Sequence, residues 1–155
     1  MTKSNSSEAD VKFMQRALEL AKLAGQREEV PVGAVLVREG VIIGEGYNQT
    51  IGAHDATAHA EIVALRDAGS GEKNYRLPGS TLYVTLEPCS MCAGAIVHAR
   101  VERVVYAALE PRAGAAVSQQ RFFESEFLNH RVTWEQGPLS SESSALIQAF
   151  FRNRR

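Results

Sequence analysis

Two short segments hold the residue types that could do chemistry together. His59 and Glu61 stand two residues apart, and Cys89 and Cys92 stand three residues apart directly after Pro88. Structural zinc sites usually have four protein ligands, whereas catalytic zinc sites use three and leave a fourth position open. One histidine and two cysteines make three ligands, so this pattern predicts an open zinc site with a carboxylate beside it.

The carboxylate of Glu61 is the expected acid–base group of that site. Two thiolates and one neutral imidazole cancel the charge of Zn²⁺, so this metal would be a weaker Lewis acid than zinc held by three histidines. A neighbouring carboxylate that takes a proton from water and delivers it elsewhere is then needed more. Glu61 could instead bind the metal, but that would fill the open position and leave no acid–base group.

The ligands are expected at the beginnings of two helices. Residues 57–68 have the pattern of a helix with Thr57 as its N-cap and Gly69 as its stop. Residues 89–99 predict a second helix after Pro88, whose missing N–H costs nothing at a first turn. The helix dipole would favour the thiolate form of both cysteines in that position.

Seven further segments complete the expected fold. The hydrophobic patterns predict helices over 8–24 and 141–152 and strands over 32–38, 41–47, 81–87, 102–108 and 131–134. This order predicts a single α/β domain over residues 1–155, with a mixed five-stranded sheet covered by helices on both faces. We expect residues 1–8 to form a disordered tail.

The composition is that of an ordinary globular chain. Its 155 residues are 45% hydrophobic and carry a formal net charge of −1, which is not the strongly basic profile of a typical phosphate binder. The first ten residues are polar and unlike a secretory leader, and no apolar stretch approaches the ~20 residues needed to cross a bilayer. We therefore expect a cytoplasmic protein with reduced cysteines and no contact with membranes.

Other uses of the same residues explain less of the sequence. Two cysteines in this spacing are also typical of a thioredoxin-like redox pair, but that use leaves His59 and Glu61 without a role. Two cysteines are too few to staple a disulfide scaffold of this size. We expect the remaining histidines, His54, His98 and His130, to be structural.

The combined motifs resemble the zinc-dependent nucleoside and nucleobase deaminases, which use His-x-Glu and Pro-Cys-x-x-Cys in these roles. More narrowly, the chain resembles the bacterial tRNA-specific adenosine deaminases from about Phe13 to Arg152. The matching segments are Val30–Leu36, Gly44–Asn48, Ala56–Glu61, Leu82–Cys89, Met91–Ala95, Asn129–His130 and Phe150–Arg152.

The resemblance implies a fold, a reaction and a set of site residues. It implies the cytidine-deaminase-like three-layer α/β/α fold and a homodimer with one Zn²⁺ per subunit. The implied reaction converts adenosine to inosine at the wobble position (34) of a tRNA anticodon loop, typically that of an arginine tRNA with the anticodon ACG. Glu61 would move protons from the attacking water to N1 of the ring and then to the departing ammonia. The zinc ligands would be His59, Cys89 and Cys92, and the substrate contacts Asn48, the N–H of Ala60, Val32, Leu86, Glu110 and Arg152.

One segment departs from the family's usual pattern. Where the family usually has Asp-Pro-Lys-x-Gly-Ala, this chain has the segment from Glu110 to Ala115, which reads Glu-Pro-Arg-Ala-Gly-Ala. The resemblance places this segment against the anticodon loop. The charges are kept, but Glu110 is one methylene longer than aspartate, so its contact with the loop can differ from the family's.

The end of the chain allows two interpretations. Arg152 and Arg154 stand beside Phe150 and Phe151, and such residues suit stacking on unpaired bases and contact with phosphates. The arginines could instead complement a helix C-terminus while the phenylalanines pack in the core. The resemblance favours an RNA contact for Arg152 and packing for Phe150.

Two rival functions share part of the motif. A deaminase of a free base or nucleoside, of guanine or cytidine type, would use the same metal chemistry, although free-cytidine enzymes often have cysteine where this chain has His59. A zinc-stabilised RNA-binding module without catalysis is disfavoured by Glu61 and by the open fourth ligand position.

Overall fold

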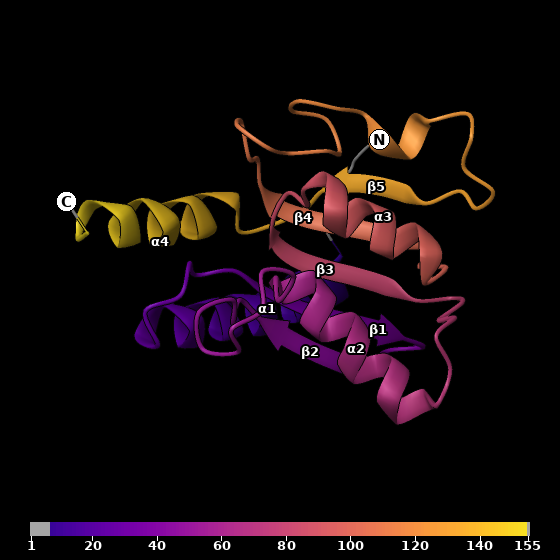
Figure 1. Cartoon of the computed structure of the whole chain (residues 1–155), viewed down its shortest axis with the longest axis horizontal. Coiled ribbons are helices and arrows are strands. Elements are labelled where there is room, and N and C mark those ends of the chain that lie inside the picture. The colour runs from indigo at the N-terminus through magenta and orange to yellow at the C-terminus, as the bar shows by residue number, and fades with distance from the viewer. Residues whose placement is uncertain (1–6, 155) are drawn as a thin grey trace.

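A mixed five-stranded sheet forms the middle layer of the molecule (Figure 1). The computed structural model describes residues 7–154. β1 is antiparallel to both β2 and β3, whereas β3, β4 and β5 are parallel. β2 and β3 therefore run in the same direction, and their carboxyl ends reach the same edge of the sheet. The strands, in the order β2-β1-β3-β4-β5 across the sheet, are β1 (Gly33–Arg38), β2 (Val41–Tyr47), β3 (Thr81–Leu86), β4 (Arg103–Ala108) and β5 (Thr133–Gln136).

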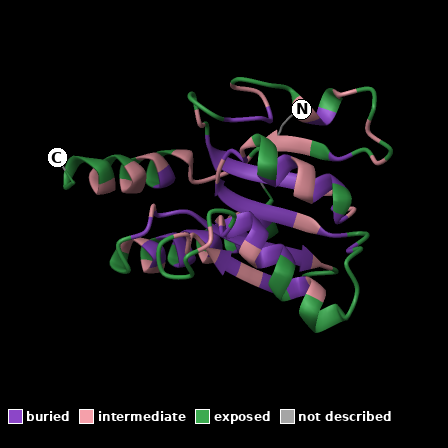
Figure 2. Ribbon diagram, in the orientation of Figure 1, coloured by how far each residue is buried: buried purple, intermediate pink, exposed green. Residues whose placement is uncertain are grey.

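Helices cover both faces of the sheet, as expected for a three-layer α/β/α fold. α1 (Glu8–Gln26) lies on one face, and α2 (Ala60–Glu72) and α3 (Ser90–His98) lie on the other. Successive residues of a strand point to opposite faces, so one strand contributes to both cores. Val35 of β1 packs under α1, and its neighbour Leu36 packs under α2 and α3. Figure 2 shows the buried residues concentrated between these layers.

The last helix, α4 (Ser140–Arg152), projects beyond the sheet (Figure 1). Its one buried residue is Ser143, whose hydroxyl donates to the carbonyl oxygen of Thr85 in β3. Just after the helix, the guanidinium of Arg154 donates to the carboxylate of Glu28 at 3.0 Å. None of the described helices has the length and apolarity needed to span a bilayer.

The beginning of α2 differs from the sequence-based prediction. Thr57 is wrong as the N-cap, because the helix begins at Ala60 with His59 in the cap position. The N–H and the hydroxyl of Thr57 instead donate to the carboxylate of Asp55, at 2.9 and 2.8 Å. This local turn keeps Thr57 out of the helix, so the imidazole of His59 lies at the helix end rather than within the helix.

Other boundaries differ by a few residues as well. Gly69 does not end α2, which continues to Glu72 and closes at Lys73, in the left-handed conformation with φ 56. Cys89 is the N-cap of α3 rather than a helical residue. In the expected tail of residues 1–8, Ser7 is the N-cap of α1 and Glu8 is its first residue, so the prediction is wrong for these two residues. Residues 1–6 lie outside the described residues.

Candidate active site

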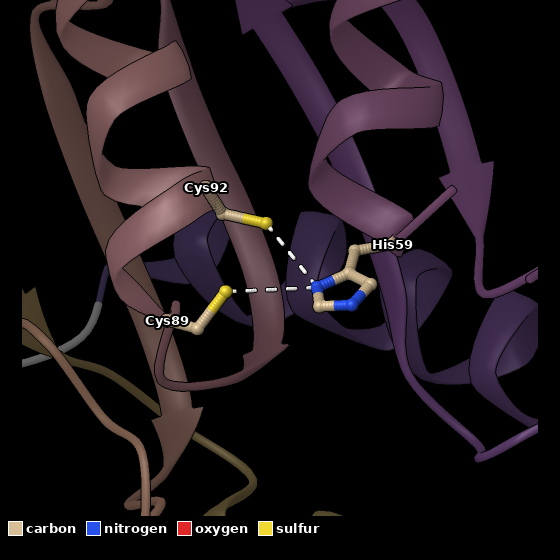
Figure 3. Close-up of side chains that lie close together, drawn as sticks. All are labelled: His59, Cys89 and Cys92. Atoms are coloured by element: carbon tan, nitrogen blue, oxygen red, sulfur yellow. Dashed lines mark hydrogen bonds between the residues drawn. The ribbon is translucent and has the colours of Figure 1, made fainter. Parts of the chain in front are cut away.

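Two helix beginnings meet at the carboxyl edge of the sheet. β2 leads through a loop to His59, the N-cap of α2, and β3 leads to Cys89, the N-cap of α3. Cys92 follows in the first turn of α3. The three side chains point toward one another from the two helices (Figure 3). Open α/β sheets commonly bind their ligands at this edge.

The spacing of the three side chains fits a zinc ion. Nδ1 of His59 lies 3.6 Å from Sγ of Cys89 and 3.5 Å from Sγ of Cys92, and all three ligand atoms lie within 4.8 Å of one another. A tetrahedral zinc with Zn–N of ~2.0 Å and Zn–S of ~2.3 Å separates nitrogen and sulfur by about 3.5 Å. The structure thus brings the predicted ligand set together, with Nδ1 as the ligating nitrogen.

The two thiols are electrostatically unequal. A hydrogen bond from Cys92, and His59 beside the sulfur, lower the pKa of Cys89 to about 4 although burial opposes this. The bond to Cys89 and burial raise the pKa of Cys92 above its ordinary value. Thiol ligands bind metals as thiolates, so zinc binding requires Cys92 to lose its proton as well.

Glu61 lies in the first turn of α2 with its side chain enclosed. The residue is 4% exposed, and this burial raises the pKa of its carboxyl group to about 7. The nearby Cys89 raises the pKa further, whereas its own backbone N–H and the imidazole of His59 lower it. A carboxyl group with a pKa near neutrality can both take and give a proton at neutral pH.

Three of the predicted substrate contacts lie together beside the metal ligands. Oδ1 of Asn48 accepts a hydrogen bond from the N–H of Ala60 at 2.8 Å, and the N–H of Asn48 donates to the carbonyl oxygen of Val32 at 3.1 Å. Ala60 and Val32 are buried. The N–H of Ala60 already has an acceptor, so it could hold a base edge only if the amide of Asn48 moved away.

Leu86 and Glu110 lie in a second group, against α4. Both line a cavity of about 670 Å³ between the carboxyl ends of β3 and β4 and the last helix. The lining of the cavity includes Phe151 of α4 and Arg154 just after the helix. Arg152 is exposed and is not part of this lining. The carboxylate of Glu110 accepts a hydrogen bond from the N–H of Arg112 at 2.9 Å, so it folds back onto its own turn.

Two buried carboxylates were missed by sequence reasoning. Glu29 accepts hydrogen bonds from the N–H groups of Ile51 and Gly52, at 3.2 and 2.7 Å, in the loop that follows Asn48. Glu87 accepts bonds from the segment 110–118. Burial would raise the pKa of Glu87, but these bonds outweigh it and lower the pKa. For Glu87, the available signal was an acidic residue at the end of an apolar strand.

The other histidines lie apart from the ligand group. A ring nitrogen of His130 bonds the carbonyl oxygen of Val101 at 2.8 Å, which supports the expected structural role. His54 and His98 are exposed.

Comparisons with known proteins agree with this geometry. Residues 7–108 match the cytidine and deoxycytidylate deaminase zinc-binding region. A tRNA-specific adenosine deaminase of Haemophilus influenzae is 51% identical over 150 residues, covering 96% of this chain and 87% of that protein. The tRNA-specific adenosine deaminase of Agrobacterium fabrum is 47% identical over 143 residues, covering 92% of this chain and 94% of that protein.

Solved structures show the same relationship. A structure from studies of A-to-I editing by tRNA:A34 deaminases at the wobble position matches with a TM-score of 0.85 and 46% identity, covering 88% of this chain and 99% of that one. Guanine deaminase from Bacillus subtilis matches with a TM-score of 0.63 and 36% identity, covering 92% and 93%. The chain therefore belongs to the zinc-binding cytidine and deoxycytidylate deaminase family and, within it, to the tRNA-specific adenosine deaminases.

Proposed function

We propose that this protein hydrolyses adenosine to inosine at the wobble position of a tRNA anticodon loop and releases ammonia. The observation that carries the proposal is the buried carboxyl group of Glu61 beside a three-ligand metal group. Relatives 51% and 47% identical to this chain are tRNA-specific adenosine deaminases, which supports the choice of substrate. An arginine tRNA with the anticodon ACG is the first substrate to test, because the resemblance implies it.

The chain's own residues account for the proton transfers of this reaction. Zinc held by His59, Cys89 and Cys92 would supply Lewis-acid activation of water at the open fourth position. The carboxylate of Glu61 takes a proton from that water and delivers it to N1 of the adenine ring. After the oxygen has bonded to the ring carbon, Glu61 takes the second proton of the water and passes it to the departing amino group. Oxygen replaces nitrogen at the ring carbon, ammonia leaves, and Glu61 returns to its starting state.

The substrate base has to leave its stack to reach this site. A hairpin loop presents an unpaired base at low unstacking cost, which favours an anticodon loop over duplex RNA. We propose that Asn48, Ala60 and Val32 position the target nucleoside. Leu86, Glu110 and Arg152 would contact the surrounding loop.

We also propose that the chain is a single deaminase domain that acts as a cytoplasmic homodimer with one zinc per subunit. An apolar groove of about 810 Å³ between α2 and α3, lined among others by Ile62, Leu65 and the exposed Tyr75, supports a self-association surface. Light scattering should give twice the chain mass of 16.9 kDa, and metal analysis should give one zinc per chain. A monomeric mass with full activity would contradict the dimer.

The decisive experiment measures deamination of three substrates: inosine formed from the arginine-tRNA anticodon stem-loop and from free adenosine, and xanthine formed from guanine. We expect rapid conversion of the stem-loop and about 100-fold or more slower conversion of free adenosine, because remote contacts of the substrate contribute to the rate. Comparable turnover of adenosine and the stem-loop would exclude the RNA-specific proposal. Turnover of guanine alone would favour the free-base alternative. Guanine is included because the chain is also similar in structure to a guanine deaminase.

A further inference from the structure

We propose that Glu87 is a positioning residue, which holds the segment 110–118 (called the recognition loop below) in register with the zinc-ligand segment 88–92. The inference rests on the proposed function, in which Glu110 of the recognition loop contacts the RNA. Glu87 itself would touch neither zinc nor substrate. Its carboxylate would instead fix the distance between the groups that do.

The carboxylate of Glu87 binds both ends of the recognition loop. Glu87 is 2% exposed, and its two oxygens accept hydrogen bonds from four backbone N–H groups and one hydroxyl. Such convergent N–H groups form an anion-binding nest, which here encloses a side chain of the same chain. The donors are the N–H of Glu110 (3.0 Å) to Oε1, the N–H groups of Ala116 (3.0 Å), Val117 (2.8 Å) and Ser118 (2.9 Å) to Oε2, and the hydroxyl of Ser118 to Oε1.

The same short stretch of chain continues into the metal site. Glu87 stands two residues before Cys89, and its N–H donates to the carbonyl oxygen of Ala108 at 2.8 Å, in the strand that leads into the recognition loop. The N–H of Ala115 donates to the carbonyl oxygen of Pro88 at 2.8 Å. The loop is thus bonded to the two residues that directly precede the first cysteine ligand.

Gly114 provides a second, independent observation. A Cβ atom added to Gly114 would overlap the carboxylate of Glu87 and lie 2.6 Å from the carbonyl oxygen of Glu110. The recognition loop therefore passes so close over the carboxylate that only a glycine fits. A loosely attached loop would leave space for a side chain at position 114. The absence of such space indicates that the recognition loop is held in one position over the carboxylate.

The position of the recognition loop matters because it forms a wall of the cavity against α4. Glu110, Pro111 and Arg112 line this cavity together with Leu86, the residue before Glu87. A displacement of ~1 Å at such a wall can reduce the rate of a reaction strongly without altering the reacting groups. Loss of Glu87 should therefore weaken the use of a large substrate more than it weakens metal binding.

The test compares Glu87→Gln with Glu102→Gln, an exposed acidic residue outside the site. Glutamine keeps the size of the side chain but turns one acceptor oxygen into a donor, so one set of N–H groups loses its acceptor. For Glu87→Gln we expect one zinc per chain, about tenfold or higher KM for the anticodon stem-loop, and a smaller change in kcat. Hydrogen exchange of the amides at 116–118 should become faster. Glu102→Gln should leave all four quantities unchanged.

A second variant covers the case in which Glu87→Gln does not fold. Gly114→Ala leaves the carboxylate intact but pushes the recognition loop away from it, and it should raise KM in the same way with zinc retained. Unchanged KM and unchanged exchange in either folded variant would overturn the proposal, as would a loss of zinc that parallels the loss of activity. If the wild-type protein neither binds nor deaminates the stem-loop, the proposed function fails by itself. Zinc content and hydrogen exchange then still decide whether Glu87 holds the loop.

Discussion

Oδ1 of Asn48 accepts the backbone N–H of Ala60 at 2.8 Å, so a residue from the loop after β2 satisfies the first free N–H of helix α2. The N-cap residue itself, His59, makes no capping bond with its side chain, because its Nδ1 faces the cysteines. Asn48 thus takes over the capping that a metal ligand cannot perform. The helix that carries Glu61 is anchored by a residue that we also propose as a substrate contact.

Two substitutions at Asn48 separate these roles. Asn48→Ala removes the acceptor and should lower the free energy of unfolding by about 1 kcal/mol, whereas Asn48→Asp keeps an acceptor and should unfold close to wild type. Both remove the Nδ2 donor, so both should lower kcat/KM for the stem-loop by about tenfold or more. Urea unfolding and inosine assays measure the two effects. Full activity of Asn48→Asp would show that Asn48 serves the helix alone.

Substitution of Glu61 should remove catalysis and leave the metal in place. Glu61→Gln keeps the volume of the buried side chain but cannot carry a proton between water and the ring. We expect kcat to fall by about 10²- to 10⁴-fold, with one zinc per chain by elemental analysis. The matched control is Glu72→Gln. Glu72 lies at the other end of the same helix, where its carboxylate pairs with Arg38. Loss of zinc in Glu61→Gln would indicate that Glu61 is a ligand.

Cys89→Ala should abolish zinc binding together with activity, because His59 and Cys92 alone make an incomplete ligand set. The metal stabilises the folded state by mass action, so the variant should also melt at a lower temperature. A chelator should lower the melting temperature of the wild-type protein but not that of the variant. The control is His98→Ala, an exposed histidine at the end of α3. Full zinc occupancy in Cys89→Ala would contradict the ligand assignment.

The parts of the site that the sequence predicted are those set by local spacing. Cys89 and Cys92 lie at the N-cap and in the first turn of one helix, and His59 and Glu61 lie at the N-cap and in the first turn of another. Their types and intervals in the sequence already indicated a metal site with an acid–base group. The supports of the site come from far along the chain. Asn48, which accepts the first N–H of α2, lies 12 residues before Ala60. Glu87 accepts hydrogen bonds from N–H groups 23 to 31 residues away. No local pattern specifies such pairs.

The fold shows the same division. The strands and helices were predicted from their hydrophobic periodicity, and all are present. The order of strands was not predictable in this way, because β1 separates β2 from β3 through pairings between distant segments. Thr57 shows at a single residue why a local sequence pattern can fail to predict a helix boundary. It has the right type for an N-cap, but its hydroxyl is taken by Asp55.

Two glycines near α2 should respond oppositely to the same substitution. A Cβ at Gly46 in β2 would lie 2.5 Å from both the carbonyl oxygen of Ala60 and the nitrogen of Ala64, whereas at Gly71 in α2 nothing lies within 4 Å. Gly46→Ala should destabilise the protein by about 1–3 kcal/mol through overpacking and displace the helix end that bears His59. Gly71→Ala should stabilise it by about 0.5–1 kcal/mol. Urea unfolding measures both, and equal effects would contradict this account of how α2 packs on β2.

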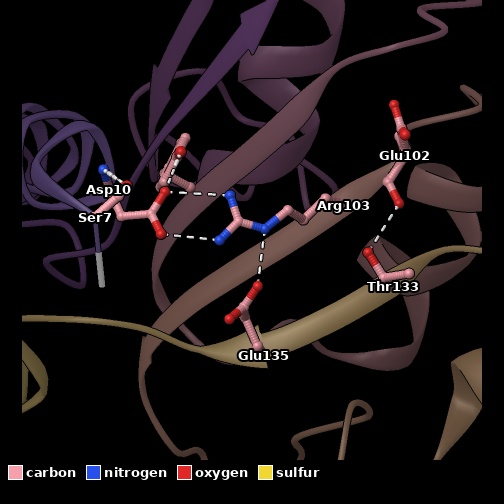
Figure 4. Close-up of polar contacts among 7 residues, drawn as sticks. Ser7, Asp10, Glu102, Arg103, Thr133 and Glu135 are labelled. Carbon is pink, nitrogen blue, oxygen red and sulfur yellow. Dashed lines mark hydrogen bonds and ion pairs between the residues drawn. The ribbon is translucent and has the colours of Figure 1, made fainter. Parts of the chain in front are cut away.

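An ion pair on the opposite face of the sheet should make stability depend on pH. Asp10 of α1 is 6% exposed and accepts hydrogen bonds from the guanidinium of Arg103 at 3.1 and 2.9 Å (Figure 4). It also accepts one from the hydroxyl of Tyr83 at 2.6 Å. Burial raises the pKa of Asp10, but the bonds from Arg103 and Tyr83 outweigh it, so the pKa lies below the ordinary value of 3.8.

A carboxyl group whose pKa is lowered by folding stabilises the folded state fully above its unfolded pKa, and this contribution disappears as the pH falls through the folded pKa. Asp10→Asn should therefore cost roughly 2 kcal/mol of unfolding free energy near neutral pH, and its difference from wild type should shrink as the pH falls below about 4. Comparing each variant with wild type at the same pH removes the effect of zinc release, which both share. Glu8→Gln, exposed in the same first turn, should show a small difference at every pH. A difference for Asp10→Asn that stayed constant down to strongly acidic pH would mean that packing, and not the charge of Asp10, holds α1 against the sheet.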